Sequence, residues 1–236
     1  MFNKDEEQER LETMNQLIAA EPDDPELSDL LIERAHIFNS LGDDVASVKD
    51  YFAALEVTRV PEKTAHIKSM ISLALLARNK KEKALWWAMA AVDQTPDNEE
   101  AHKVLGMNLA ISEFHRLAVE SFKKTLEINP ENQEAFLAWG VNLREDWKQL
   151  EEARVILTAY TKKYPTDAKG LFELAFTTYI SAVGADYSVQ LFKAKELFEK
   201  TLTLECSERL QRRINNNLQD IDKMIREAEI QKSKHQ

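Results

Sequence analysis

The sequence has few of the residues that break helices or cross-link chains. Among its 236 residues there are five glycines, six prolines and one cysteine, Cys206. All-β folds need frequent turns rich in glycine and proline, so this scarcity favours long helices with few breaks. A single cysteine excludes an internal disulfide and a thiolate metal cluster, and we interpret Cys206 as a small apolar residue near a helix end.

Long apolar stretches are also missing. No uninterrupted run is long enough to cross a membrane, and the amino terminus lacks the apolar core of a signal peptide. We therefore expect a cytoplasmic protein without membrane insertion. The formal net charge of −10 repels nucleic acid and anionic lipid, and no run of Lys or Arg stands out. Nucleic acid is accordingly not expected as a partner.

The sequence shows no motif of catalysis or cofactor binding. It has no glycine-rich phosphate loop, no G-x-S-x-G elbow and no H-E-x-x-H helix. The five histidines are scattered, and no two of them stand four positions apart, as a metal-binding pair on a helix would. We expect no enzyme activity, no cofactor and no metal site.

What the sequence does contain is an internal period. Pro61, Pro96, Pro130 and Pro165 are separated by 35, 34 and 35 residues. Two series of small residues recur in the same rhythm, and the second series is followed four positions later by a mostly larger side chain. The first series is Ala35, Ser72, Gly106, Gly140 and Ala175; the second is Ser47, Ala84, Ala118, Ala153 and Ala194; the following residues are Tyr51, Ala88, Phe122, Leu157 and Phe198.

This pattern resembles the tetratricopeptide repeat, in which W-x2-L-G-x2-Y, then A-x3-F, then P recur over about 34 residues. The clearest copy, residues 99–132, has Leu105-Gly106, Leu109, Ala118, Phe122 and Pro130 in the matching places. The resemblance implies an all-α fold, a right-handed α-solenoid of about five antiparallel helix pairs. In each pair the small residues let two helices approach closely, and neighbouring pairs stack to bury their apolar faces.

The repeats divide the chain into a solenoid with a cap at each end. We predict an N-terminal capping helix in residues 1–27 and a C-terminal capping helix with a tail in residues 207–236. The solenoid, residues 28–206, consists of the repeats 28–64, 65–98, 99–132, 133–167 and 168–206. Residues 208–229 place apolar side chains in one helical stripe, which suits a cap on the last repeat. The same stripe would also suit the seam of a homodimer.

The resemblance further implies a partner-binding groove, lined by the first helix of each pair. Carried over by repeat position, the groove residues are Ile32, His36, Met70, Leu73, Lys103, Val104, Met107, Ile111, Val141, Arg144, Phe172, Phe176 and Tyr179. Most are apolar, and an exposed apolar groove containing methionines suits a hydrophobic or amphipathic protein segment. The alternative is that the superhelix or the N-terminal helix covers these side chains.

Some proteins of this family hold the terminal carboxylate of a partner with Lys, Asn and Arg side chains. This sequence has Lys103 and Lys169 at matching positions, but Met107, Ala138 and Phe172 replace other polar donors. That carboxylate clamp is therefore absent or incomplete.

Our leading hypothesis is a protein-interaction module, adaptor or chaperone-like, that binds a hydrophobic or amphipathic segment of another protein or peptide in the groove. The alternative is a structural scaffold that self-associates through its convex face or its C-terminal helix. Trp86 and Trp87 lie on a predicted second helix, where one ring packs inward and the other would be available on the convex side.

Overall fold

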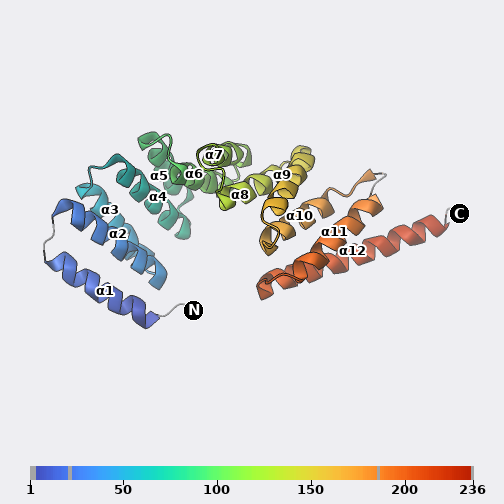
Figure 1. Ribbon diagram of the computed structural model, residues 1–236, viewed down its shortest axis with the longest axis horizontal. Helices are drawn as coiled ribbons and strands as arrows, with labels where there is room; N and C mark the ends of the chain where they lie inside the picture. Colours follow the sequence, from blue (N-terminus) through green and yellow to red (C-terminus); the bar gives the residue numbers. More distant parts are fainter. Residues whose placement is uncertain (1–3, 21–22, 185–186, 235–236) are drawn as a thin grey trace. The chain divides into compact units, whose positions relative to one another are not determined.

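The computed structural model describes residues 4–20, 23–184 and 187–234. Within these residues the chain forms twelve α-helices and one 3-10 turn, with no strand (Figure 1). The prediction of an all-α helical repeat is confirmed. No helix in the described ranges combines the length and apolar character that a membrane span requires.

The chain forms two compact units, residues 1–132 and 133–236. The first unit contains three antiparallel pairs, α2 with α3, α4 with α5 and α6 with α7, and α1 packs on α2. Its helices are α1 (Lys4–Ala19), α2 (Asp24–Leu41), α3 (Asp44–Val57), α4 (Pro61–Ala77), α5 (Lys81–Gln94), α6 (Glu99–Ile111) and α7 (His115–Ile128). Successive pairs meet where α3 packs on α4 and α5 packs on α6.

The second unit contains the pairs α8 with α9 and α10 with α11, and α12 packs on α11 and α10. Its elements are α8 (Gln133–Arg144), η1 (Trp147–Gln149), α9 (Leu150–Lys163), α10 (Ala168–Ile180), α11 (Tyr187–Leu202) and α12 (Glu208–Lys234). Helix α12 begins where the C-terminal cap was expected.

Short polar side chains and proline set where the helices start. Three helices begin at a side chain that accepts a hydrogen bond from a backbone N–H group of the first turn. These caps are Asp43 for α3, Asn98 for α6 and Asp167 for α10. Pro61 is the first residue of α4, where its missing N–H costs nothing. Gly42 ends α2 with a positive φ of 82°, a conformation that glycine adopts without strain.

The N-cap of α2 places the start of this helix earlier than the predicted boundary at residue 28. The side chain of Asp23 accepts a hydrogen bond from the backbone N–H of Glu26, so α2 begins at Asp24. The first helix of the first pair thus starts inside the segment 1–27 that was assigned to the N-terminal cap. The further division of the chain into repeats remains a prediction.

The periodic small residues lie where two helices of a pair come closest. A Cβ atom on Gly106 of α6 would lie 2.7 Å from the ring of Phe122 on α7. A Cβ atom on Gly140 of α8 would lie 2.7 Å from Leu157 on α9. Both partners are buried, so the spacing of small and large residues in the sequence corresponds to direct packing between the paired helices.

Candidate functional site

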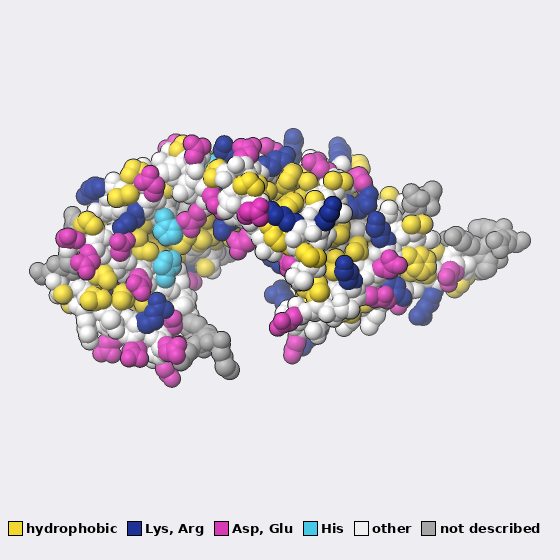
Figure 2. All heavy atoms as spheres, in the orientation of Figure 1, with side chains coloured by type: hydrophobic (Ala, Val, Ile, Leu, Met, Phe, Trp, Pro, Cys, Tyr) yellow, Lys and Arg dark blue, Asp and Glu magenta, His cyan; other side chains and the backbone are white. Residues whose placement is uncertain are grey.

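The first helices of the three pairs in the first unit share one surface, which we call the A face. It consists of Ile32, His36, His66, Met70, Leu73, Glu100, Lys103, Met107 and Ile111, from α2, α4 and α6. Side-chain contacts connect these helices. The rings of His36 and His66 are 6.4 Å apart, and the Nδ1 atom of His66 lies 2.7 Å from the carboxylate of Glu100. This proximity can be followed in Figure 2, where histidine side chains lie next to one another on this unit.

Of the eight groove residues predicted in the first unit, three are exposed, four are half-buried and one is buried. Ile32 and Met70, two of the half-buried residues, pack against the core of the unit. Met107 is 36% exposed and Ile111 is 44% exposed. His36 is also exposed, whereas the other four are half-buried: Ile32, Met70, Leu73 and Lys103. The A face therefore offers apolar contact area mainly at α6, with smaller contributions from α4 and α2.

The prediction for Val104 is wrong, because this side chain is buried. Val104 shares a helical stripe with Ala101 and Asn108, which are also buried. The amide nitrogen of Asn108 donates hydrogen bonds to the backbone oxygen of Val104 and to the hydroxyl of Ser72 on α4. This stripe of α6 faces the neighbouring helices and is closed to a partner.

A chain of hydrogen bonds orients His36. The amide nitrogen of Asn39 lies 3.1 Å from the hydroxyl of Tyr51, and that hydroxyl lies 3.2 Å from Nδ1 of His36. Burial raises the pKa of Tyr51 to about 12, so its hydroxyl keeps its proton and can donate to His36. With Nδ1 as the acceptor, neutral His36 has its proton on Nε2, which is then available as a hydrogen-bond donor.

The pKa values of the two histidines are shifted in opposite directions from the ordinary value of histidine. Burial lowers the pKa of His36, and the nearby His66 lowers it further. The hydrogen bond to Glu100 raises the pKa of His66 against the effect of burial. Burial would raise the pKa of Glu100, but the bond with His66 outweighs it and the pKa of Glu100 is lowered. As the pH falls, His66 gains its proton before His36 does.

His66 and Glu100 were not among the residues predicted from the sequence. A signal was present, because the two residues stand 34 positions apart and so occupy the same place in successive repeats. In the part of the chain that the structure describes, no group of three or more His, Cys, Asp or Glu side chains could hold a metal ion. His36, His66 and Glu100 thus form a polar cluster on the A face.

In the second unit, helix α12 covers most of the predicted groove residues. Phe172 is buried, and Phe176 and Tyr179 are half-buried in one apolar cluster with Ile214 and Ile221 of α12. The prediction that Phe172 lines an open groove is wrong, and the alternative of cover by the chain itself holds here. The covering element is the C-terminal helix, whereas the sequence alternatives were the superhelix itself or the N-terminal helix.

The two remaining predicted residues of the second unit are also engaged. Val141 is half-buried and packs against the core formed by α8, α9 and α10. The guanidinium of Arg144 forms an ion pair with the mostly buried carboxylate of Glu173 and lies 5.1 Å from the ring centre of Phe176. Arg144 is therefore engaged in the packing of α8 on α10.

A second accessible surface of the first unit lies on the second helices of its pairs. Phe52 of α3 contacts Trp87 of α5, with ring centres 5.4 Å apart, and Trp87 contacts Trp86 at 4.8 Å. Trp87 packs against the core of the unit, whereas Trp86 is 61% exposed. We call Phe52, Trp86 and Trp87 the outer aromatic cluster.

Comparison with known proteins identifies the fold. No family model and no curated protein sequence matches this chain. Among solved structures it resembles YrrB, which is described as a TPR protein with an unusual peptide-binding site. The two sequences are 19% identical, the match covers 79% of this chain and 91% of that chain, and the TM-score is 0.59. MamA (41-end) from Desulfovibrio magneticus RS-1 matches with 17% identity, 75% and 94% coverage and a TM-score of 0.63.

Yeast Tom70 matches 84% of this chain with 14% identity and a TM-score of 0.67, and the match covers 40% of that chain. At these identities the likeness concerns the fold alone. The chain has the tetratricopeptide-repeat fold, as the spacing of its small residues indicated.

Proposed function

We propose that this chain is a protein-interaction module, of adaptor or chaperone-like type, and that its A face binds an apolar or amphipathic segment of a partner protein. The supporting observation is the exposure of Met107 and Ile111 on α6, beside the half-buried Met70 and Leu73 of α4. A group of exposed apolar side chains usually marks an interaction site. The description of YrrB as a peptide-binding TPR protein agrees with this proposal.

The spacing of these side chains suits a helical or extended segment. Met107 and Ile111 are four residues apart, so they lie one turn from each other on the same side of α6. Methionine is unbranched and adapts its shape to different partners. Complete burial of such a side chain contributes about 1.5–3 kcal/mol, so each anchor of this kind strengthens binding by about tenfold or more.

The polar residues of the A face would set the register of the bound segment. The Nε2–H group of His36 can donate a hydrogen bond, while the pair of His66 and Glu100 presents both a donor and an acceptor. A segment with apolar side chains over α6 and a hydrogen-bonding backbone over α2 and α4 fits this arrangement best.

The test is the affinity of a labelled amphipathic peptide for wild type and two matched variants. Met107→Glu places a charge on the A face and should weaken binding at least about tenfold, because a carboxylate would be desolvated without a partner. Met89→Glu is the control, since Met89 is 57% exposed on α5, outside the A face. Equal affinities of both variants and wild type would contradict the proposal.

Self-association through the outer aromatic cluster is the second candidate function, because an exposed tryptophan is a common anchor of protein interfaces. Trp86 is 61% exposed and stands against Trp87, which the core holds in place. Light scattering over a range of concentrations tests this candidate. A dimer that is lost in Trp86→Ala supports it, whereas a wild-type monomer at high micromolar concentration rejects it.

A further inference from the structure

The second unit has a surface depression of about 300 Å³ between the beginnings of α10 and α12. Its lining consists of Lys169, Glu173, Ser207, Arg209, Leu210 and Arg213. We call this site the basic depression. It lies wholly within residues 133–236, outside the A face of the first unit.

Three cationic side chains surround this depression without a compensating charge. Lys169, Arg209 and Arg213 are exposed and form no ion pair with any residue that the structure describes. The one acidic side chain in the lining, Glu173, is already paired with Arg144. Such a concentration of positive charge is unexpected on a chain with a net charge of −10.

The scaffold holds part of this charge in place. The guanidinium of Arg213 lies 4.4 Å from the ring centre of Phe172, which is fully buried. A planar guanidinium stacked on a fixed ring keeps its N–H groups free at the edge, where they can donate to an anion. The hydroxyl of Ser207 accepts a hydrogen bond from the backbone N–H of Leu210 and caps α12, whose N-terminus adds partial positive charge.

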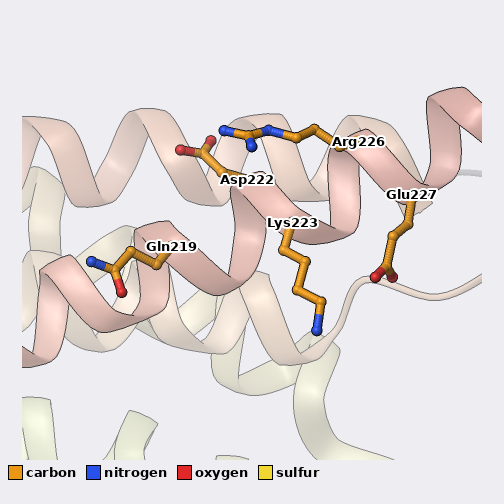
Figure 3. Close-up of a pocket in the computed structure, with 5 residues that line it drawn as sticks. All are labelled: Gln219, Asp222, Lys223, Arg226 and Glu227. Atoms are coloured by element: carbon orange, nitrogen blue, oxygen red, sulfur yellow. The ribbon is translucent and has the colours of Figure 1, made fainter.

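A second depression of the same unit provides a contrast (Figure 3). It is lined by Gln219, Asp222, Lys223, Arg226 and Glu227, all from α12. Asp222 binds Lys195 of α11 at 2.6 Å, so two cations, Lys223 and Arg226, remain in this lining beside one carboxylate, that of Glu227. The excess of positive charge is therefore larger at the basic depression than at this second depression.

We propose that the basic depression binds an acidic segment of a partner protein through its Asp and Glu side chains. Three uncompensated cations match several carboxylates better than the single carboxylate of a chain terminus. The overall negative charge of the protein opposes nucleic acid, whose backbone extends beyond a site of this size. This binding activity is separate from the proposed function of the A face, in both its location and the chemistry of its ligand.

The test is fluorescence anisotropy at low ionic strength with a labelled peptide that contains a run of Glu and Asp and has both ends blocked. A peptide with Gln and Asn at the same positions is the ligand control. Lys169→Gln and Arg209→Gln should each weaken binding of the acidic peptide about threefold to fivefold, as exposed charge pairs do, and the double variant about tenfold. Added salt should weaken binding by wild type.

Arg212→Gln is the matched protein control. Arg212 stands on the same turn of α12, is exposed and forms an ion pair with Glu208 instead of lining the depression. Its substitution removes the same net charge and should leave the affinity within about twofold of wild type. Circular dichroism checks that every variant keeps its helical content.

Three results would overturn the proposal. The first is equal binding of the acidic peptide and its Gln/Asn counterpart, or no binding of either at low salt. The second is an effect of Arg212→Gln as large as that of Arg209→Gln, which would indicate a diffuse charge effect. The third is tighter binding of a peptide with a free terminal carboxylate and no acidic side chains, or of a single-stranded oligonucleotide, with loss in the same variants.

Discussion

At the scale of single residues, glycines of the repeat work by leaving room for a neighbouring ring. A Cβ atom on Gly170 would lie 2.1 Å from the ring of Tyr160, which is closer than the 2.7 Å between a Cβ atom on Gly106 and Phe122. The ring of Tyr160 cannot easily turn away, because its hydroxyl is bonded to Asp167 and Gln133. These close approaches explain why the repeat needs small side chains at fixed positions.

We predict that Gly106→Ala destabilises the protein despite the better helix propensity of alanine. The clash with Phe122 should cost about 1–3 kcal/mol, against a gain of about 1 kcal/mol from propensity. Chemical denaturation of wild type, Gly106→Ala, Phe122→Leu and the double variant measures the coupling. The loss in the double variant should be smaller than the sum of the single losses, and additive losses would argue against direct packing.

The pair of His66 and Glu100 should make the stability depend on pH. The raised pKa of His66 contributes stability that is complete below about pH 6.5 and is lost as the pH rises through its folded value. The lowered pKa of Glu100 contributes stability above its ordinary value of 4.5, which is lost as the pH falls through the folded value. The ion pair therefore stabilises the folded protein most between about pH 4.5 and about pH 6.5.

Glu100→Gln should remove this contribution. Because both side chains are more than a third exposed, the loss near pH 5.5 should be no more than about 1 kcal/mol, and it should shrink at pH 8. Denaturation at the two pH values measures the difference, and an NMR titration should show a lower pKa for His66 in the variant. An unchanged pKa of His66 would contradict the assigned bond.

At the scale of helices, α12 completes the core of the second unit. Ile214 and Ile221 are buried against Phe172 and Phe198, whereas Ile230, farther along the same helix, is 54% exposed. Helix α12 thus buries apolar side chains of α10 and α11, which suits the cap that the sequence predicts. Solenoids require such a cap because the last pair otherwise exposes an apolar face to water.

Ile214→Ala and Ile221→Ala should each cost about 2–4 kcal/mol of unfolding free energy, because each leaves a cavity in this cluster. Ile230→Ala makes the same change on the same helix at an exposed position and should stay within about 0.5 kcal/mol of wild type. Denaturant unfolding of the three variants tests the packing. Equal, small effects at all three positions would instead favour the alternative that the apolar stripe of α12 forms an intermolecular seam.

The sequence was sufficient for the helical fold and for the packing positions, because both follow from a period that recurs along the chain. Gly106 and Phe122, for example, are identified by spacing alone. The groove was harder to predict, because a one-residue difference in register turns a helical side chain by about 100°, from the surface into the core. Val104 was misassigned for this reason. Phe172 and Phe176 are covered by α12, and no local sequence pattern predicts that contact.

At the scale of the whole chain, the structure consists of two compact units with separate accessible sites. The A face belongs to the first unit, and the basic depression belongs to the second. Apolar anchors and uncompensated cations favour different ligands, so the two proposed sites can be tested independently. Both proposals concern protein binding, for which the repeat fold provides a long helical surface.

The most direct test of the central claim uses the methyl groups of methionine as NMR probes. Met70 and Met107 belong to the A face, whereas Met14 lies on α1, Met89 on α5 and Met224 on α12. Titration with an amphipathic peptide should shift the methyl signals of Met70 and Met107 with one common affinity and leave the other three in place. Shifts confined to Met89 or Met224, or none at saturating peptide, would contradict binding at the A face.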